Sequence, residues 1–272
     1  MPTLDRLGDR LAAAGTRGER LLVLYLTLGD PLADSLELAV AAVAAGADVL
    51  ELGIPTPGTR PRGTDIASSF DRARECSPDR ALALVRELRD RLPGTPLLAL
   101  VYPPTVADIG ADRLPELAAA AELDGLVLTD PDGGLTAGQV AAAGLSAIPL
   151  VTPGTDPARR RQLEDTARHL TYQTLAERTG VLLDPTQVGR IAETAARTAT
   201  KPFLAGFGIR DEHDIRAVAP HAGGVVIGSE LYRGLAAAQQ AARVAWTGTA
   251  VRRWKAATVL SRTDLARSGH AR

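Results

Sequence analysis

The sequence alternates strand-like and helix-like segments about eight times. Short apolar runs that end at Gly, Pro or Asp predict strands near residues 21–28, 47–55, 96–102, 125–128, 147–151, 170–175, 202–205 and 223–227. The segments between them have helical patterns, which is typical of a parallel sheet with crossover helices. Eight such repeats in 272 residues favour a single closed α/β barrel, the (β/α)8 or TIM barrel, over an open sheet.

Both ends of the chain are expected to add helices to this barrel. Residues 2–14 carry Leu4, Leu7 and Leu11 at helical spacing, which suits a helix at the bottom of the barrel. We expect the barrel to span residues 1–245 and a C-terminal helical extension with a polar tail to span residues 246–272. The apolar residues of the extension fit either packing on the barrel or a contact in a homo-oligomer.

Composition and charge exclude several classes of function. The net charge of −1 gives no electrostatic case for binding nucleic acid or an acidic membrane. No apolar run reaches the ~18 residues of a membrane span, and no secretory pattern opens the sequence, so we expect a cytoplasmic protein. Cys76 is the only cysteine and the four histidines lack metal-ligand spacing, so no metal site is expected.

Acid–base chemistry in this chain falls to carboxylates. The only lysines are Lys201 and Lys255, and neither follows a predicted strand at the end where a Schiff-base lysine would be needed. Glu51, by contrast, interrupts the second apolar run near its carboxyl end, which is where parallel α/β proteins carry their chemistry. Two readings of Glu51 remain open: a general acid or base with a raised pKa, or a structural carboxylate held by N–H groups or an arginine.

The last two strands are followed by loops suited to an anion. Gly206 and Gly208 follow the seventh strand and leave backbone N–H groups open to close approach, and Gly228 and Ser229 lie at a helix N-terminus. A helix N-terminus favours negative charge, and barrels often bind phosphate between these two loops. The sequence therefore predicts a small-molecule substrate with an anionic group.

Other polar residues predicted at the same mouth each have a structural alternative. Asp130 fits either a substrate contact or an Asx turn before Pro131, and Asp65 fits either a catalytic group or a helix N-cap. Tyr25 and Tyr102 fit either hydroxyl groups of the site or packing side chains. Arg60 and Arg62 fit either anion-binding groups or solvated side chains.

These residues occur in motifs that resemble the tryptophan synthase alpha subunit family. The segment 26–31, LTLGDP, is similar to that family's first-strand motif, and the segment 44–55, AAGADVLELGIP, to its second-strand signature. Residues 124–130, 207–209 and 223–229 resemble later blocks, so the similarity covers roughly residues 1–240. The resemblance implies a barrel that cleaves indole-3-glycerol phosphate to indole and glyceraldehyde 3-phosphate, without a cofactor, and that usually docks on a beta subunit.

The resemblance also assigns roles to individual residues. Glu51 occupies the family's general acid–base position, and Gly206, Gly208, Gly228 and Ser229 would hold the phosphate. Tyr172 and Gly180 fall in stretches that line the family's site.

Two departures from the family pattern concern the chemistry. An ungapped alignment places Arg62 where the family has a second catalytic aspartate, so a carboxylate that would stabilise positive charge on indole becomes a cation. In the loop after the sixth strand, Leu182 replaces the threonine expected to meet the acid–base glutamate. Because these loops also carry much of the family's beta-subunit contact, the departures weigh against a beta-type partner.

Three hypotheses follow for this sequence. The first is a diverged lyase, in specialised metabolism for example, that uses Glu51 for proton transfer on an anionic substrate, with Arg60 or Arg62 binding a second anionic group. The second is a non-catalytic or regulatory barrel. The third is an ordinary alpha subunit in which Asp65 replaces the missing aspartate.

Overall fold

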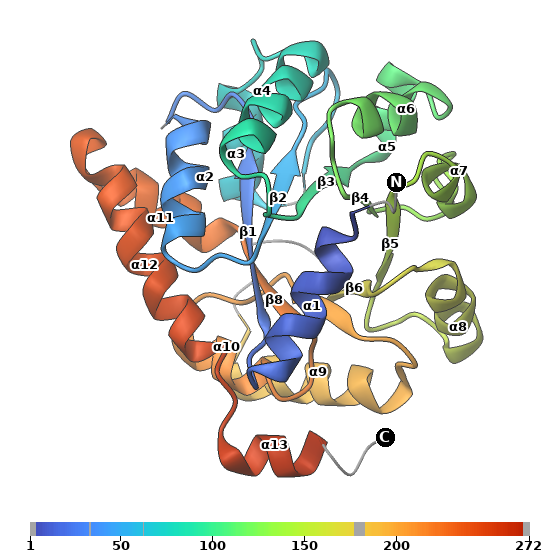
Figure 1. The fold of residues 1–272 in the computed structure, drawn as a ribbon, viewed down its shortest axis with the longest axis vertical. Helices are drawn as coiled ribbons and strands as arrows, with labels where there is room; N and C mark the ends of the chain where they lie inside the picture. The colour runs from blue at the N-terminus through green and yellow to red at the C-terminus, as the bar shows by residue number, and fades with distance from the viewer. Residues whose placement is uncertain (1–3, 33, 62, 177–182, 269–272) are drawn as a thin grey trace.

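The computed structural model describes residues 4–32, 34–61, 63–176 and 183–268. Its eight strands pair in parallel and in sequence order, and they close into one barrel (Figure 1). The TIM barrel expected from the sequence is therefore confirmed. The strands are β1 (Leu21–Thr27), β2 (Val49–Gly53), β3 (Leu97–Val101), β4 (Gly125–Leu128), β5 (Ser146–Val151), β6 (Thr171–Thr174), β7 (Phe203–Gly206) and β8 (Gly224–Ile227).

Helices surround the barrel and connect successive strands. They are α1 (Arg6–Thr16), α2 (Ser35–Ala44), α3 (Thr64–Arg72), α4 (Pro78–Arg91), α5 (Pro103–Ile109), α6 (Arg113–Ala120), α7 (Ala137–Ala142), α8 (Pro157–Thr166), α9 (Pro185–Thr198), α10 (Glu212–Val218), α11 (Ser229–Ala237), α12 (Arg243–Ala257) and α13 (Arg262–Ser268), with a 3-10 turn η1 (Gln240–Ala242).

Aspartate side chains begin several of the helices that follow strands. Asp34, Asp156, Asp184 and Asp211 each accept first-turn backbone N–H groups of α2, α8, α9 and α10. Such caps satisfy donors that have no partner within the helix. These caps fix where α2, α8, α9 and α10 begin after their strands.

The N-terminal helix covers the opposite end of the barrel. Leu7 of α1 is buried, and Arg6 donates to the Pro93 carbonyl and the Asp124 carboxylate, at the loops that lead into β3 and β4. Helix α1 is seen in front of the strands in Figure 1. This placement confirms the expected N-terminal helix and leaves the carboxyl ends of the strands as the open mouth.

The helix that begins at Ser229 ends before the C-terminal extension begins. Helix α11 ends at Ala237 and α12 begins at Arg243, because the Trp246 ring lies over Gly234, where a Cβ atom would be 1.8 Å from it. Arg243 Nε also donates to the Leu235 carbonyl, at 2.8 Å, near the C-terminus of α11. The expected boundary at residue 246 therefore falls inside α12.

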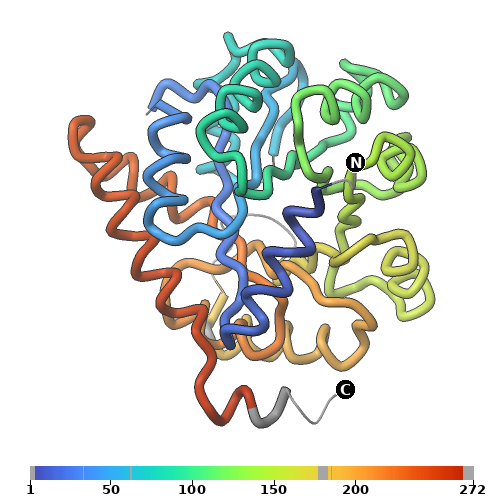
Figure 2. The backbone as a smooth tube through the Cα atoms, viewed as in Figure 1, coloured from blue at the N-terminus to red at the C-terminus, as the bar shows by residue number. Residues whose placement is uncertain are grey.

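Helix α12 packs on the barrel's own helices. It contacts α2 and α10, and Figure 2 shows this late segment of the chain beside the early α2. Val251 and Trp254 are buried, whereas Val244 and Val259 are exposed. Val251 and Trp254 thus contribute to this chain's own core, whereas Val244 and Val259 remain on the surface.

Candidate active site

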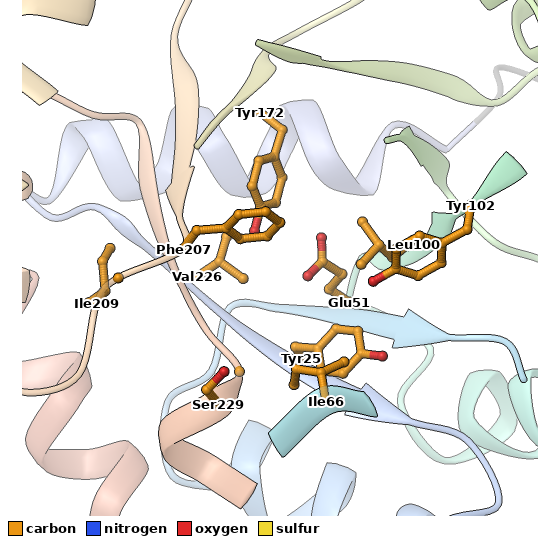
Figure 3. A pocket seen from close by; sticks show the side chains of 12 residues that line it. Tyr25, Glu51, Ile66, Leu100, Tyr102, Tyr172, Phe207, Ile209, Val226 and Ser229 are labelled. Atoms are coloured by element: carbon orange, nitrogen blue, oxygen red, sulfur yellow. The ribbon is translucent and has the colours of Figure 1, made fainter. Parts of the chain in front are cut away.

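A cavity opens at the carboxyl ends of the strands. It encloses about 420 Å³ between atoms, counting the space that opens to solvent. Among the described residues that line it, Glu51 is the one carboxylic acid, and Figure 3 shows the Glu51 carboxyl group between the aromatic side chains. The lining residues are Tyr25, Glu51, Ile66, Leu100, Tyr102, Tyr172, Phe207, Gly208, Ile209, Val226, Gly228 and Ser229.

Glu51 is the acid of this cavity. It lies on β2 beside Tyr25 in the β1–β2 register, its side chain is 1% exposed, and its Oε1 has no hydrogen-bond partner among the described residues. Burial raises the pKa of Glu51 to about 8, because the charged form loses water without gaining a compensating contact. At neutral pH the group is therefore mostly a neutral acid that can donate a proton and then take one back.

Two glycines make room for the tyrosines that surround this acid. A Cβ atom on Gly53 would lie 2.1 Å from the Tyr25 hydroxyl, and one on Gly206 would lie 2.0 Å from the Tyr172 hydroxyl. Gly206 does not itself line the cavity; it supports Tyr172, whose ring meets Phe207 edge-on. Burial raises the pKa of each cavity tyrosine, so all three phenols are neutral at physiological pH.

The glycine loops after β7 and β8 border the same cavity. Phe207 and Gly208 have φ of 65° and 96°, in the left-handed region that a non-glycine residue enters only at an energetic cost. Gly228 is the N-cap of α11 and supplies no side-chain acceptor for the first-turn N–H groups. Uncapped amides and the helix dipole make this place suitable for an anion.

An ion-pair network stands beside the anion cradle formed by Gly208, Gly228 and Ser229. Arg233 on α11 contacts Glu230 at 2.7 Å and Asp65 on α3 at 3.1 Å. Asp65 is thus paired outside the cavity lining. It is also not the N-cap of α3, because Gly63 holds that position; the capping role expected for Asp65 was wrong.

The remaining predicted site residues lie elsewhere. Arg60 is exposed and donates to the Thr59 carbonyl. Asp130 is exposed and accepts the Asp132 N–H, which is the Asx turn considered as its alternative. Neither lines the cavity. Arg62 and Gly180, as well as Leu182, lie outside the described residues.

Several lining residues were not singled out from the sequence. Leu100 and Val226 lie on predicted strands, and inward alternation along β3 and β8 could have indicated them. Ile66, Phe207 and Ile209 depend on how the helix and loop backbones turn, which has no simple sequence signal. These apolar side chains form the walls that exclude water from Glu51.

The described residues add two negative findings. They contain no cluster of three or more His, Cys, Asp or Glu side chains that could hold a metal ion. Within the same part of the chain, every helix is too short or too polar to cross a membrane.

The two lysines lie away from the cavity. Lys255 pairs with Asp48 and Glu19, and neither Lys255 nor Lys201 lines the cavity.

Fold and site together define a (β/α)8 barrel with a cavity, a buried acid and loops suited to an anion at its carboxyl-terminal mouth. The family model described as tryptophan synthase alpha chain matches residues 11–258. The chain therefore belongs to the tryptophan synthase alpha chain family.

Curated relatives and solved structures support this membership. The tryptophan synthase alpha chain of Halorhodospira halophila is 33% identical over 238 residues, covering 85% of this chain and 87% of the relative. That of Xanthomonas oryzae pv. oryzae is 36% identical over 247 residues, covering 86% and 91%. The structure of tryptophan synthase subunit alpha from Legionella pneumophila superposes with a TM-score of 0.82 at 26% identity, covering 94% of this chain and 99% of that one.

Proposed function

We propose that the protein is a carbon–carbon lyase that cleaves indole-3-glycerol phosphate or a similar anionic substrate by a retro-aldol reaction. Glu51 is its general acid and base, and the phosphate lies at Gly208, Gly228 and Ser229. One observation carries this proposal: the Glu51 carboxyl group is buried without an ion pair among the described residues, in the cavity that also borders the cradle.

Proton balance suits a single carboxyl group. Cleavage breaks the bond between the indole ring and the glycerol chain, and the ring carbon that loses the chain gains a proton. The hydroxyl on the departing carbon loses its proton as that carbon becomes an aldehyde. One proton is delivered and one is recovered, so an acid that starts neutral, as Glu51 does, returns to its starting state.

The cavity walls suit the two ends of such a substrate. Aromatic and aliphatic side chains, among them Tyr25, Tyr102 and Tyr172, surround Glu51 and would pack against an apolar ring. The open amides at the start of α11 provide for the anionic end. In this proposal the two ends lie on either side of the carbon that Glu51 protonates.

Arg62 is one of the two departures that separate this chain from the family pattern. In the alignment it replaces a carboxylate that would stabilise positive charge developing on the ring. A unit charge pair at ~4 Å is worth ~4 kcal/mol at an effective dielectric of 20. Losing a favourable charge and gaining an unfavourable one would slow cleavage by orders of magnitude, so we propose a slow reaction on this substrate or a related substrate that places an anion at Arg62.

The test is an assay of indole release from indole-3-glycerol phosphate. Wild-type protein is compared with Glu51→Gln and with Glu75→Gln, which changes an exposed glutamate outside the cavity. Release that is detectable in wild type and in E75Q, and lost in folded E51Q, supports the proposal. Release that persists in E51Q contradicts it.

A second candidate function is a non-catalytic or regulatory barrel, favoured by Arg62 and Leu182 in place of expected site residues. The same variant separates the two functions when a phenotype is scored in cells. A phenotype that E51Q preserves supports the regulatory role. A phenotype that E51Q loses supports catalysis. Adding a beta-type subunit and measuring complex formation tests whether this chain binds such a partner.

A further inference from the structure

A second pocket lies on the outside of the barrel, between α8 and α9, which are neighbours around the barrel in Figure 1. It encloses about 740 Å³ between atoms, including open solvent. Arg160 and Gln173 form its buried floor, and Arg190 and Thr194 lie on its exposed rim. We call it the α8–α9 groove.

The floor of this groove contains a guanidinium group with an unused donor. Arg160 is 5% exposed, and its Nη2 donates to the Gln173 side-chain oxygen. Its Nη1 forms an ion pair with Glu164 Oε1 at 3.6 Å, and neither of these two atoms has a hydrogen-bond partner among the described residues. A buried N–H group without an acceptor costs free energy, so an acceptor that enters the groove would be favoured there.

Charge and polarity narrow the class of ligand. The negative charge of Glu164 offsets the positive charge of Arg160, whereas Arg190 adds a second guanidinium group at the rim. The Thr194 and Thr198 hydroxyls donate to carbonyls of their own helix, so Arg160 and Arg190 are the charged donors among the residues that line the groove. The remaining walls include the apolar residues Pro153, Pro157 and Ile191.

We propose that the α8–α9 groove is a second binding site, which takes a small monocarboxylate with an apolar or aromatic group. The carboxylate bridges the Arg160 Nη1 and the Arg190 guanidinium, since planar guanidinium groups suit carboxylate oxygens. The apolar group packs on the prolines and Ile191. This proposal does not depend on the reaction proposed for the central cavity.

The floor residue Gln173 adjoins a residue of the central cavity. Gln173 contacts Arg160 from β6, and the preceding residue, Tyr172, lines the central cavity. Successive residues of a strand point to opposite faces. The ligand uses Nη1 and leaves the Nη2 bond to Gln173 in place, so the groove adjoins the strand that holds Tyr172.

Benzoate is the probe for this groove, with benzamide as an uncharged match. Titration of isotope-labelled full-length protein, followed by amide NMR, is expected to show saturable shifts around α8 and α9 with benzoate. Benzamide is expected to bind at least about tenfold more weakly, the effect of losing a charge-assisted hydrogen bond.

Two variants test the assignment. Arg190→Gln changes an exposed residue and is expected to weaken benzoate binding severalfold, while Arg160→Lys is expected to abolish it. Arg161→Gln, an exposed change on α8 outside the groove lining, is the matched control and should bind as wild type does.

The proposal is overturned if benzoate produces no saturable shifts, since water alone would then satisfy Arg160. It is also overturned if benzamide binds as well as benzoate, or if R190Q binds as tightly as wild type. R190Q keeps the test decisive even if Arg160→Lys does not fold.

Discussion

A side chain on Gly53 would occupy the position of the Tyr25 hydroxyl: an ideal Cβ atom there lies 2.1 Å from that oxygen. Gly53 follows Glu51 on the same face of β2, so the glycine lets Tyr25 lie beside the acid. The Tyr25 hydroxyl in turn bonds the Thr27 hydroxyl at 3.1 Å. The contact between Gly53 and Tyr25 thus shapes the wall of the cavity.

We predict that Gly53→Ala destabilises the fold by about 1–3 kcal/mol, the usual cost of overpacking a core. Replacing a strand glycine by alanine would otherwise stabilise by roughly 0.5–1 kcal/mol. Chemical denaturation measures the difference in unfolding free energy between the variant and wild type.

A second substitution identifies the cause. Tyr25→Phe removes the clashing oxygen, so it should recover part of the loss when combined with G53A. Gly15→Ala in α1, where a Cβ would have no neighbour within 4 Å, is the control and should not destabilise. Equal losses with and without Y25F would show that the clash is not the cause.

Glu51 is predicted to reduce stability increasingly as pH rises. Its pKa is about 8 in the folded protein against an ordinary value of 4.5, so between these values the folded state binds the extra proton. The unfolding free energy therefore falls with rising pH in this window, by about 1.4 kcal/mol per unit. Below pH 4.5 Glu51 is protonated in both the folded and the unfolded state, so it causes no loss of unfolding free energy. Above pH 8 it is ionised in both states, and the loss has reached its full size.

Glu51→Gln removes this pH dependence. The unfolding free energy of the variant minus that of wild type is therefore expected to rise by about 3 kcal/mol between pH 4 and pH 7. Denaturation curves of both proteins across this pH range measure the effect. A stability difference that stays constant with pH would mean that Glu51 is already ionised in the folded state.

Restoring a carboxylate at position 62 is predicted to increase indole release. Arg62→Asp replaces an opposing charge by a favourable one, and a gain of about 10²-fold or more in kcat/KM is expected. Arg60→Asp, which makes the same charge change two residues away, should give a smaller gain. If R60D and R62D gave equal rates, the effect would come from general charge and not from a position facing the substrate.

Asp65 is predicted not to be a catalytic replacement for the missing aspartate. It is paired with Arg233 outside the cavity lining, so Asp65→Asn should lower stability by less than about 1 kcal/mol and leave indole release within a few-fold of wild type. A loss of activity comparable to that of E51Q, in a folded protein, would restore Asp65 as a catalytic candidate.

The eight strands were predictable because each is a short apolar run with a clear stop. The same reasoning located Glu51 and the glycine loops, since strand ends in a closed parallel barrel meet at one mouth. The Asp65–Arg233 pair was not predictable, because it joins residues 168 positions apart through the relative placement of α3 and α11.

The break between α11 and α12 also had no local signal. The sequence there is rich in alanine, which favours a continuous helix, whereas the packing of Trp246 over Gly234 and the bond from Arg243 to the Leu235 carbonyl accompany the turn. Pro103 and Pro104 were expected to end the third strand, and they also begin α5, because proline suits the first turn of a helix.

The most direct test of this account is the titration of Glu51 itself. Carbon NMR of protein labelled at glutamate side-chain carbons, with E51Q to assign the signal, follows its ionisation from pH 4 to pH 9. The account predicts a midpoint near 8, with the carboxyl group neutral at pH 7. A midpoint at or below 4.5 would show a permanently charged, compensated carboxylate and would contradict the role of Glu51 as the proton donor of the cavity.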